Sequence, residues 1–447
     1  MVRSHIGLGS GSPSVRGGGR PVTDKTFAER TQRVQLPNGV TLLVYENPAN
    51  PTVHVSGALR AGAFLDPQNQ PGLAHITASM LMRGTRRRTK VEIARDLEDV
   101  GAELNISGNR FLVRASGQAL SKDAPRLLTN LAEVLREPAF PEDELTRLKQ
   151  QVVGQLRRQQ EQTQVRALER FLQLTYDRTH PFYQVPIEER ISSVESLAVD
   201  DVVAFYEQHY GAATLIVVVV GDVQAAIIED LVTELLGDWT PGRPAEIAVG
   251  RTAPRGEPRR EIVTMRDKPN VDIVLGHPGQ LRRTDPDYYA AYIANAALGH
   301  STLSSRLGLR VRDEEGLTYG IVSRFLDPGF VDGPWLVSLT VNPENVDRAI
   351  DSTVNIITSY VEEGITEREL EDEKSSFVGS FIVGLGTNAG IAAHLLSAEV
   401  YGLGIEHLDA LPELVKSVTR DEVNAAITKY IHPEQLVTVI AGEYPPD

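Results

Sequence analysis

The side chains that most often bind transition metals or act as strong nucleophiles, histidine and cysteine, are few or absent in this sequence. It contains ten histidines and no cysteine, so thiolate nucleophiles, disulfides and cysteine-ligated zinc are excluded, and a metal would need His, Asp and Glu ligands. No HExxH motif and no paired histidines are present. His394 and Glu399, five residues apart, fall on different faces of a predicted helix, and we interpret them as packing residues.

Composition and charge narrow the classes of function. The 447 residues are 41% hydrophobic and 23% charged, as in a soluble globular protein with more than one domain. The formal net charge of −15 disfavours nucleic acid and anionic membranes as partners, because both require a cationic face. The longest aliphatic run, from Leu215 to Val220, is far shorter than the ~20 residues of a membrane-spanning helix, and we predict no membrane span.

The N-terminal segment, residues 1–26, is rich in Gly, Ser and Arg, and we predict that it is flexible. It has no apolar stretch of the kind that signal peptides carry. A linker, an expression remnant and the stub of a removed leader all fit this composition. The sequence therefore leaves the compartment open, and we expect a soluble protein of the bacterial periplasm or cytoplasm.

Three segments recur in the same order about 220 positions further along the chain, which indicates an internal duplication. The segment from Phe140 is repeated from Ile365, with a Glu, a Leu and a Lys in register. The other two repeats are those of PTVHVSGAL by PNVDIVLGH and of DVVAFYEQHY by DEVNAAITKY. We predict an α+β fold made of two homologous domains of about 220 residues, each a mainly antiparallel sheet packed with helices.

The domain limits follow from the composition between the two copies. Residues 240–260 are rich in Pro, Gly and Arg, as linkers are, so we predict an N-terminal domain at 27–239 and a C-terminal domain at 261–447. In each domain the expected order is strand, helix, strands, long helices and strand. Val40 to Glu46 and the stretch from Thr52 are predicted to pair as neighbouring strands across the turn NPANP.

Three motifs resemble one known family. LPNGVTLLV near the start, GLAH at the head of a predicted helix, and SSRLGLRVRDEEGLTYG in the second half are similar to sequences of the pitrilysin/insulinase-type metallopeptidases. That family includes mitochondrial processing peptidase and the core subunits of the respiratory cytochrome bc complex. The resemblance extends from Phe27 to the C-terminus, and it implies paired α+β domains, in agreement with the duplication.

The resemblance also locates a zinc motif, and this chain departs from it. Active members carry H-x-x-E-H on a helix, where the two His bind zinc, the Glu deprotonates water, and a distant Glu is the third ligand. Here the motif positions hold His75, Ala78 and Ser79, and the distant position corresponds to Gln155. Alanine cannot accept a proton, and Ser and neutral Gln are poor zinc ligands. We expect no metal and no other cofactor on this chain, and no proteolysis by the chain alone.

A second signature of the family is retained. An Arg and a Tyr seven residues apart, in R-E-x-x-G-L-x-Y, reach in the family to the zinc site of the opposite half, and here they are Arg312 and Tyr319. Both are hydrogen-bond donors, as an oxyanion intermediate requires. The acids between them, residues 313–315, are interpreted as a solvated turn.

The resemblance implies a chain that serves a metal-bearing partner. We expect a zinc-bearing homologous subunit, or the other half of a tandem protein, to supply zinc, while this chain closes a chamber and contributes Arg312 and Tyr319 to the cleavage of unfolded peptides. The peptide would add as a strand to a sheet edge of the partner, which leaves residues 104–113 here as a vestigial copy. The alternatives are a structural subunit like the core proteins and a peptide-binding module that does not cut.

Overall fold

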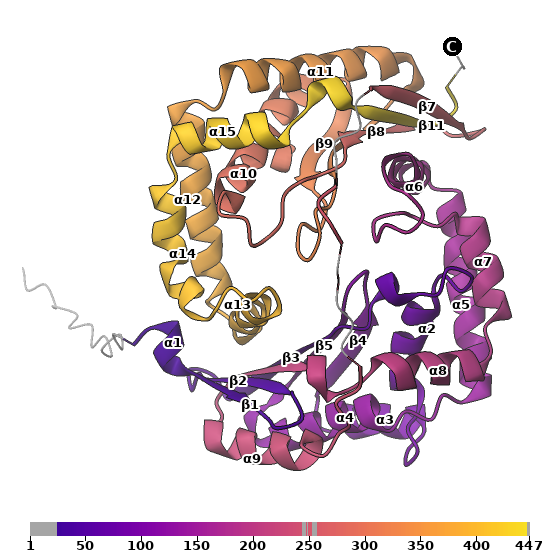
Figure 1. Ribbon diagram of the computed structural model, residues 1–447, viewed down its shortest axis with the longest axis vertical. Coiled ribbons are helices and arrows are strands. Elements are labelled where there is room, and N and C mark those ends of the chain that lie inside the picture. Colours follow the sequence, from indigo (N-terminus) through magenta and orange to yellow (C-terminus); the bar gives the residue numbers. More distant parts are fainter. Residues whose placement is uncertain (1–24, 244–246, 248, 253–256, 445–447) are drawn as a thin grey trace, which may run out of the picture.

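The computed structural model describes residues 25–243, 247, 249–252 and 257–444, which form two α+β halves around two separate sheets (Figure 1). The predicted flexible segment lies outside the described residues except for Lys25 and Thr26, and the predicted linker is described only in part. Arg259 and Arg260, which the sequence places in the linker, belong to a strand. We therefore propose that the second domain begins at this strand rather than at residue 261.

The first half has a six-stranded mixed sheet in the order β1-β2-β6-β3-β5-β4. Its strands are β1 (Thr31–Gln35), β2 (Thr41–Glu46), β3 (Thr52–Leu59), β4 (Glu103–Gly108), β5 (Val113–Leu120) and β6 (Ile216–Gly221). Its helices are α1 (Phe27–Arg30), α2 (Leu73–Met80), α3 (Lys90–Glu98), α4 (Ala124–Arg136), α5 (Glu142–Gln160), α6 (Thr163–Thr175), α7 (Ile187–Ser196), α8 (Val199–His209) and α9 (Ala225–Leu236). Only β2 and β6 pair in parallel; the other neighbours are antiparallel.

The second half has a five-stranded sheet in the order β7-β11-β8-β10-β9. Its strands are β7 (Arg259–Thr264), β8 (Val271–His277), β9 (Thr318–Phe325), β10 (Trp335–Val341) and β11 (Val437–Gly442). Its helices are α10 (Tyr288–Asn295), the π-helical segments η5 (Ala296–His300) and η6 (Gly308–Glu314), α11 (Val346–Glu363), α12 (Glu367–Gly384), α13 (Asn388–Val400), α14 (Glu406–Ser417) and α15 (Arg420–Tyr430). Here too one pair, β7 with β11, is parallel.

The predicted duplication is confirmed by this topology. The order β2-β6-β3-β5-β4 in the first sheet corresponds to β7-β11-β8-β10-β9 in the second, and β1 has no counterpart among the described strands. The helix that starts at Glu142 corresponds to the one that starts at Glu367, as the repeated segments predict. Both carry acidic residues in the first turn, which favours a helix N-terminus. The α+β prediction with two homologous domains is therefore correct.

The predicted pairing of the strands around Val40–Glu46 and Thr52 is wrong. β6, which arrives at the end of the first half, lies between β2 and β3 and hydrogen-bonds to both. Val217 to Val220 are all fully buried, as expected for a central strand that is covered on both faces. The short turn between β2 and β3 only reverses the chain. The apolar run of β6 gains more burial in the middle of the sheet than at its edge.

The two halves exchange a helix. α6 of the first half packs on β8 and β11 of the second sheet, and α13 of the second half packs on β3 and β6 of the first sheet (Figure 1). In β2, Leu42 and Val44 face a core made by the first half's own helices, whereas Leu43 and Tyr45 belong to the core shared with the second half. The exchange therefore joins both halves through one continuous apolar core.

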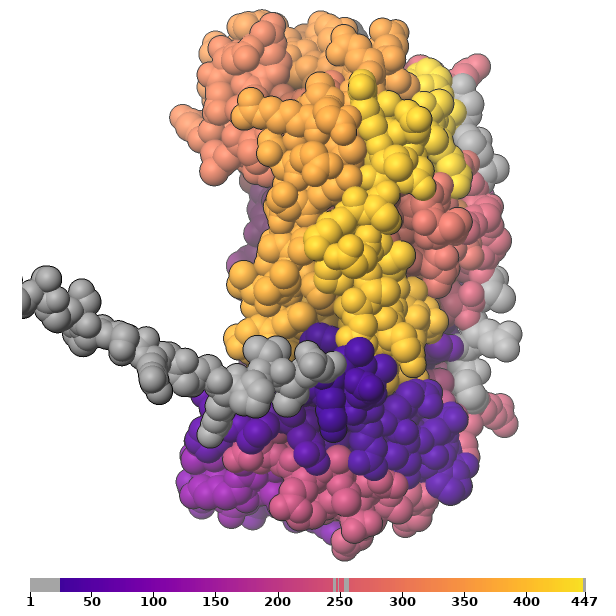
Figure 2. Space-filling model, turned by 90° about the vertical axis from the view of Figure 1, so that its left-hand side faces the viewer, coloured from indigo at the N-terminus to yellow at the C-terminus, as the bar shows by residue number. Residues whose placement is uncertain are grey.

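Polar contacts at the surface also join the two halves. The amide nitrogens of Phe27 and Ala28 in α1 donate to the Asp409 carboxylate of α14, over 2.6 and 3.2 Å. Arg33 of β1 makes a two-pronged ion pair with Glu399 of α13, at 3.0 and 2.8 Å. Figure 2 shows the indigo start of the described chain directly against the orange and yellow C-terminal helices.

Candidate functional site

The helix α2 places His75 at a wall of the first half. The helix begins after Gly72, whose φ of 102° is in the left-handed region that favours glycine. Asp66 serves as its cap, because the carboxylate accepts hydrogen bonds of 2.7 Å from the backbone N–H groups of both Gly72 and Ala74. Burial raises the pKa of Asp66 to about 6, although both hydrogen bonds act in the opposite direction.

The four positions of the degenerate zinc motif differ in their burial and surroundings. The His75 side chain is exposed in a hollow, where desolvation lowers its pKa, and its ring N–H donates to the Gly108 carbonyl of β4. Ala78 is fully buried. A Cβ on Gly108 would lie only 3.2 Å from the Ala78 methyl group, so helix and strand pack in direct contact there. Ser79 is half-buried, and Gln155 lies exposed on α5.

These residues do not fit a zinc ion. One imidazole, that of His75, remains of the family's ligand set, whereas a protein zinc site needs three or four ligands. The position of the general base holds a methyl group sealed against β4. Across the described part of the chain, no group of three His, Asp or Glu side chains could hold a metal ion. We therefore derive no hydrolytic step from this half of the chain.

The hollow beside His75 is rich in cations. It has a volume of about 540 Å³ and is also lined by Arg110, Arg178, His180 and Arg190, with Asp66 as its acid. Arg178 and Arg190 pair with glutamates of neighbouring helices. Arg110 donates to the Pro181 carbonyl oxygen and stacks on Phe182, and its desolvation lowers its pKa. Sequence reasoning missed this cluster because Arg110 and His180 are 70 residues apart and no motif connects them.

The structure brings Arg312 and Tyr319 together at the edge of the second sheet. The Arg312 Nε donates to the Tyr319 carbonyl oxygen over 3.2 Å, and the guanidinium also pairs with Asp313. The Tyr319 side chain is 95% exposed. Together with Asn270 and Thr340 the pair lines a hollow of about 520 Å³. Arg312 in η6 thus contacts the backbone of Tyr319, the second residue of edge strand β9, and both side chains line one hollow.

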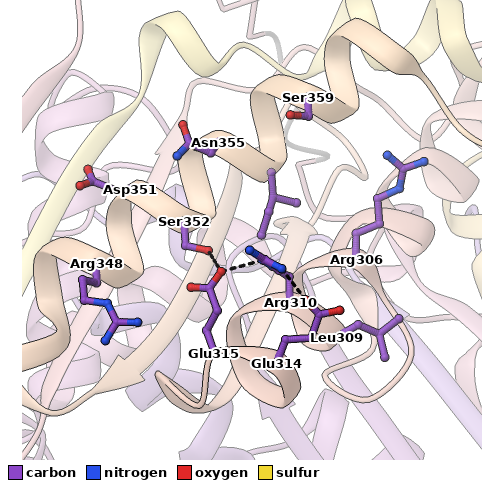
Figure 3. A pocket seen from close by; sticks show the side chains of 11 residues that line it. Arg306, Leu309, Arg310, Glu314, Glu315, Arg348, Asp351, Ser352, Asn355 and Ser359 are labelled. Carbon is purple, nitrogen blue, oxygen red and sulfur yellow. Dashed lines mark hydrogen bonds and ion pairs between the residues drawn. The ribbon is translucent and has the colours of Figure 1, made fainter.

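A network of charges holds the segment that carries Arg312 (Figure 3). Arg310 lies between Glu314 and Glu315, with an Nε–Oε1 distance of 2.7 Å to Glu315. Ser352 of α11 donates to the same Glu315 oxygen over 3.1 Å. The interpretation of residues 313–315 as a solvated turn was therefore incomplete, since each of the three acids pairs with an arginine. These contacts tie η6 to α11 along a hollow of about 550 Å³.

A second support for η6 comes from Arg306, which lines the same hollow. Arg306 forms a two-pronged ion pair with Glu369 of α12, at 2.6 and 2.7 Å, and stacks on Tyr360. Glu369 also completes the capping box of α12 with Thr366. The sequence shows the Thr–Glu box but not the arginine that approaches it, because Arg306 lies 63 positions earlier.

The two candidate sites are separate. The hollow at His75 and the hollow at Arg312 and Tyr319 have no lining residue in common. Of the predicted site residues, the structure therefore groups Arg312 with Tyr319 and leaves His75, Ala78, Ser79 and Gln155 apart from them. Within the described segments no single helix is long and apolar enough to cross a membrane, although α12 and α13 taken together, bent by 114°, would satisfy length and composition alone.

Comparison with protein families gives two matches. Residues 41–184 match the model described as Insulinase (Peptidase family M16), and residues 196–377 match the model described as Peptidase M16 inactive domain. These two segments span both sites described above. The second description refers to residues 196–377 and not to the segment that carries His75.

Relatives and solved structures agree with these matches. An uncharacterized zinc protease of Mycobacterium tuberculosis is 26% identical over 413 residues, covering 91% of this chain and 92% of the relative. A protein of Helicobacter pylori named non-peptidase homolog is 23% identical over 409 residues, covering 90% and 92%. A crystal structure of a peptidase M16 inactive domain from Pseudomonas fluorescens superimposes with a TM-score of 0.85 at 26% identity, covering 92% of this chain and 97% of that one.

Proposed function

Because the chain belongs to the insulinase-type peptidase family, M16, we propose that it is the non-zinc-binding partner of a zinc peptidase of the same family. In this proposal it closes the chamber around an unfolded peptide and supplies Arg312 and Tyr319 to the partner's active site. The partner is a zinc-bearing homologous subunit or the other half of a tandem protein. Alone, the chain does not cleave peptides, because Ala78 cannot accept a proton from water.

One observation carries the proposal: the Arg312–Tyr319 pair is presented to solvent, away from the chain's own degenerate motif. A Tyr that is 95% exposed contributes little to a core, so packing does not explain its place. Arg312 is oriented toward it by the 3.2 Å contact with the Tyr319 carbonyl oxygen. Nothing in the first half of the described chain lies ready to use these donors, whereas a partner docked on this edge could.

The proposed role of Arg312 and Tyr319 is electrostatic stabilisation of the transition state. Zinc in the partner, when bound, would supply a Lewis acid and an activated water. The guanidinium of Arg312 and the hydroxyl of Tyr319 would donate to the oxygen of the scissile carbonyl as negative charge develops there. Such donors act mainly in the transition state, so they raise kcat more than they lower KM.

The test is turnover by the assembled complex with a zinc-bearing homologue from the same cell. Arg312→Ala and Tyr319→Phe should each lower kcat roughly 10²–10³-fold, with KM little changed. Arg368→Ala is a matched control, because Arg368 of α12 has a side chain that is 92% exposed and, among the described residues, forms an ion pair with Asp372 alone. Wild-type kcat in a correctly assembled Arg312→Ala complex would contradict the proposal and favour a structural subunit.

The name of the Helicobacter pylori relative, non-peptidase homolog, supports a second candidate, a chain without a role in cleavage. This candidate predicts that Arg312→Ala acts on stability alone. The melting temperature and kcat of the same preparation separate the two, since the proposed role lowers kcat at an unchanged melting temperature.

A further inference from the structure

The centre of the molecule is a contact between two hairpin loops, one from each half (Figure 1). The β4–β5 loop carries Phe111 and the β9–β10 loop carries Phe330, with ring centroids 5.5 Å apart. The Tyr401 ring lies 5.3 Å from Phe330. The β9–β10 loop is anchored by the fully buried Asp332, which accepts two hydrogen bonds from Arg282, at 2.9 and 2.6 Å. The junction is therefore a fixed aromatic surface.

Two arginines reach this junction from the first sheet. Ala58 of β3 pairs with Arg114 of β5, and Ala58 belongs to the core on the side of the sheet that faces the second half. Along β5 the buried residues alternate with exposed ones, and Arg114 is exposed. The Arg60 guanidinium, just beyond the end of β3, lies 5.6 Å from the centroid of Phe330. Both cations therefore stand on the inner side of the sheet.

Two more arginines complete the set. Arg110, next to Phe111, lines the hollow beside His75 and has its guanidinium 4.4 Å from the Phe182 ring. Arg283 stacks 4.2 Å from the Tyr288 ring. The pKa of Tyr401 is raised by burial and by Asp327 and lowered by Arg114 and Arg283, so these groups share one electrostatic environment.

The positive charge of this set is not balanced. Arginines elsewhere in the chain commonly pair with carboxylates, as Arg33 does with Glu399. In contrast, among the described residues no carboxylate forms an ion pair with Arg60, Arg110, Arg114 or Arg283. Asp327 is the acid that senses Arg110 and Arg114, and burial raises its pKa. Against a net charge of −15 for the whole chain, the inner wall therefore carries a local excess of cations.

We propose that this inner wall binds an acidic segment of an extended polypeptide, with its carboxylates on Arg60, Arg110, Arg114 and Arg283 and an apolar side chain against Phe330 and Tyr401. We name these four arginines the inner arginines. Guanidinium groups bind carboxylates through paired, charge-assisted hydrogen bonds, and aromatic rings beside them favour a neighbouring apolar side chain. Glu103 lies at the far end of β4, eleven positions before Arg114 in the sequence, and its carboxylate accepts a hydrogen bond from Gln118. The cationic wall thus selects acidic peptides, although the protein as a whole is negatively charged.

This inference deepens the proposed function by naming the substrate class, and it rests on that function only where cleavage is concerned. Binding itself needs no zinc-bearing partner. A binding experiment on the purified chain therefore succeeds or fails independently of the experiment on Arg312 and Tyr319.

The test uses three fluorescein-labelled, unstructured twelve-residue peptides of one sequence frame, with four Glu, four Gln or four Lys. Fluorescence anisotropy with the full chain should show the Glu peptide binding at least tenfold more tightly than the Gln peptide, and the Lys peptide binding least. Raising the salt concentration from 50 to 300 mM should lower the affinity for the Glu peptide but not that for the Gln peptide. Arg114→Gln and Arg283→Gln should each reduce its affinity roughly five- to tenfold.

Arg95→Gln is the matched control, because Arg95 is an exposed arginine of α3 that forms no ion pair with a described residue. Melting curves identify any variant that is misfolded, and Arg114 is the more informative site because its side chain is exposed. Equal affinity for the Glu and Gln peptides would overturn the inference. So would losses in Arg95→Gln as large as those in Arg114→Gln, since the binding would then follow the charge of the whole surface.

Discussion

The sites at His75 and at Arg312 lie beside the corresponding edge strands β4 and β9 of the two sheets, yet they are built in opposite ways. In the first half a helix packs directly on edge strand β4, with the Ala78 methyl group sealed against Gly108. In the second half a π-helical segment precedes edge strand β9 and holds its polar side chains out to solvent by ion pairs. The first site is maintained by apolar packing and the second by charge.

The largest effect is expected from returning the general base to the sealed site. Ala78→Glu places a carboxylate at a fully buried position without a partner, so it should lower the free energy of unfolding by about 3–5 kcal/mol. Ser79→His, one residue further at a half-buried position, is the control and should cost less than about 1 kcal/mol. Urea denaturation of both variants measures this. Equal stability of Ala78→Glu and wild type would show that the site is open and not sealed.

The second site should be sensitive to the loss of charge. Glu369→Gln keeps an oxygen for the capping box but removes the ion pair with Arg306, and we expect a loss of about 2 kcal/mol. Glu422→Gln is a closely matched control, because Glu422 makes the same capping box with Thr419 and is exposed. The loss at Glu369 should exceed that at Glu422 in the same denaturation experiment. Equal losses would mean that the cap, and not the ion pair, supports η6.

Acid should affect the two sites in opposite directions. The pKa of Asp66 is raised by burial to about 6, above its ordinary 3.8, so the folded state takes up a proton first and is stabilised as the pH falls from 6 toward 3.8. Glu369 is stabilised in its charged form mainly by Arg306, against the effect of burial, so its pKa is lowered from 4.5 and its contribution is lost only below that value.

Asp66→Asn isolates the first of these effects. Between pH 6 and 4, wild type should gain stability relative to this variant by up to about 1 kcal/mol per pH unit. Unfolding free energies at four pH values give the slope, and carboxyl chemical shifts of Asp66 give its pKa directly. A flat difference between the two proteins would mean that the two backbone hydrogen bonds fully offset the effect of burial on the pKa of Asp66.

Much of the fold could be predicted from the sequence because the sequence contains an internal duplication. The repeats from Phe140 and Ile365 predicted equivalent helices, and the strand expected at the end of each domain is present as β6 and β11. The insertion of β6 between β2 and β3 was not accessible, because strand neighbours depend on tertiary packing and not on the turn between them. The exchange of α6 and α13 was missed for a similar reason: amphipathic periodicity does not tell which sheet a helix covers.

For the sites, the sequence located individual positions but not their surroundings. Arg312 and Tyr319 were found through a motif, since they are close in sequence. The inner arginines come from segments as distant as Arg60 and Arg283, and no local pattern joins them. The Asp66 cap had a weak signal, a turn-rich stretch DPQNQPG before the helix, which sequence reasoning did not use.

The smallest effect should come from the outer part of the network that supports η6. The Arg310 side chain is 57% exposed and that of Glu315 is 20% exposed, so solvent and salt screen their 2.7 Å contact more than that of Arg306 with Glu369. A double-mutant cycle with Arg310→Ala and Glu315→Ala should give a coupling energy of about 0.5–1 kcal/mol, decreasing at high salt. Ser352 donates to Glu315 as well, so Glu315→Ala should cost more stability than Arg310→Ala.

Turnover of the assembled complex tests which contacts position Arg312. If η6 is held chiefly by Glu369, neither outer substitution should change this turnover by more than about twofold. Glu369→Gln should reduce it further, because it loosens the segment that carries Arg312. A coupling energy near zero with a large loss of turnover would instead make the outer pair a positioning device for Arg312 rather than a source of stability.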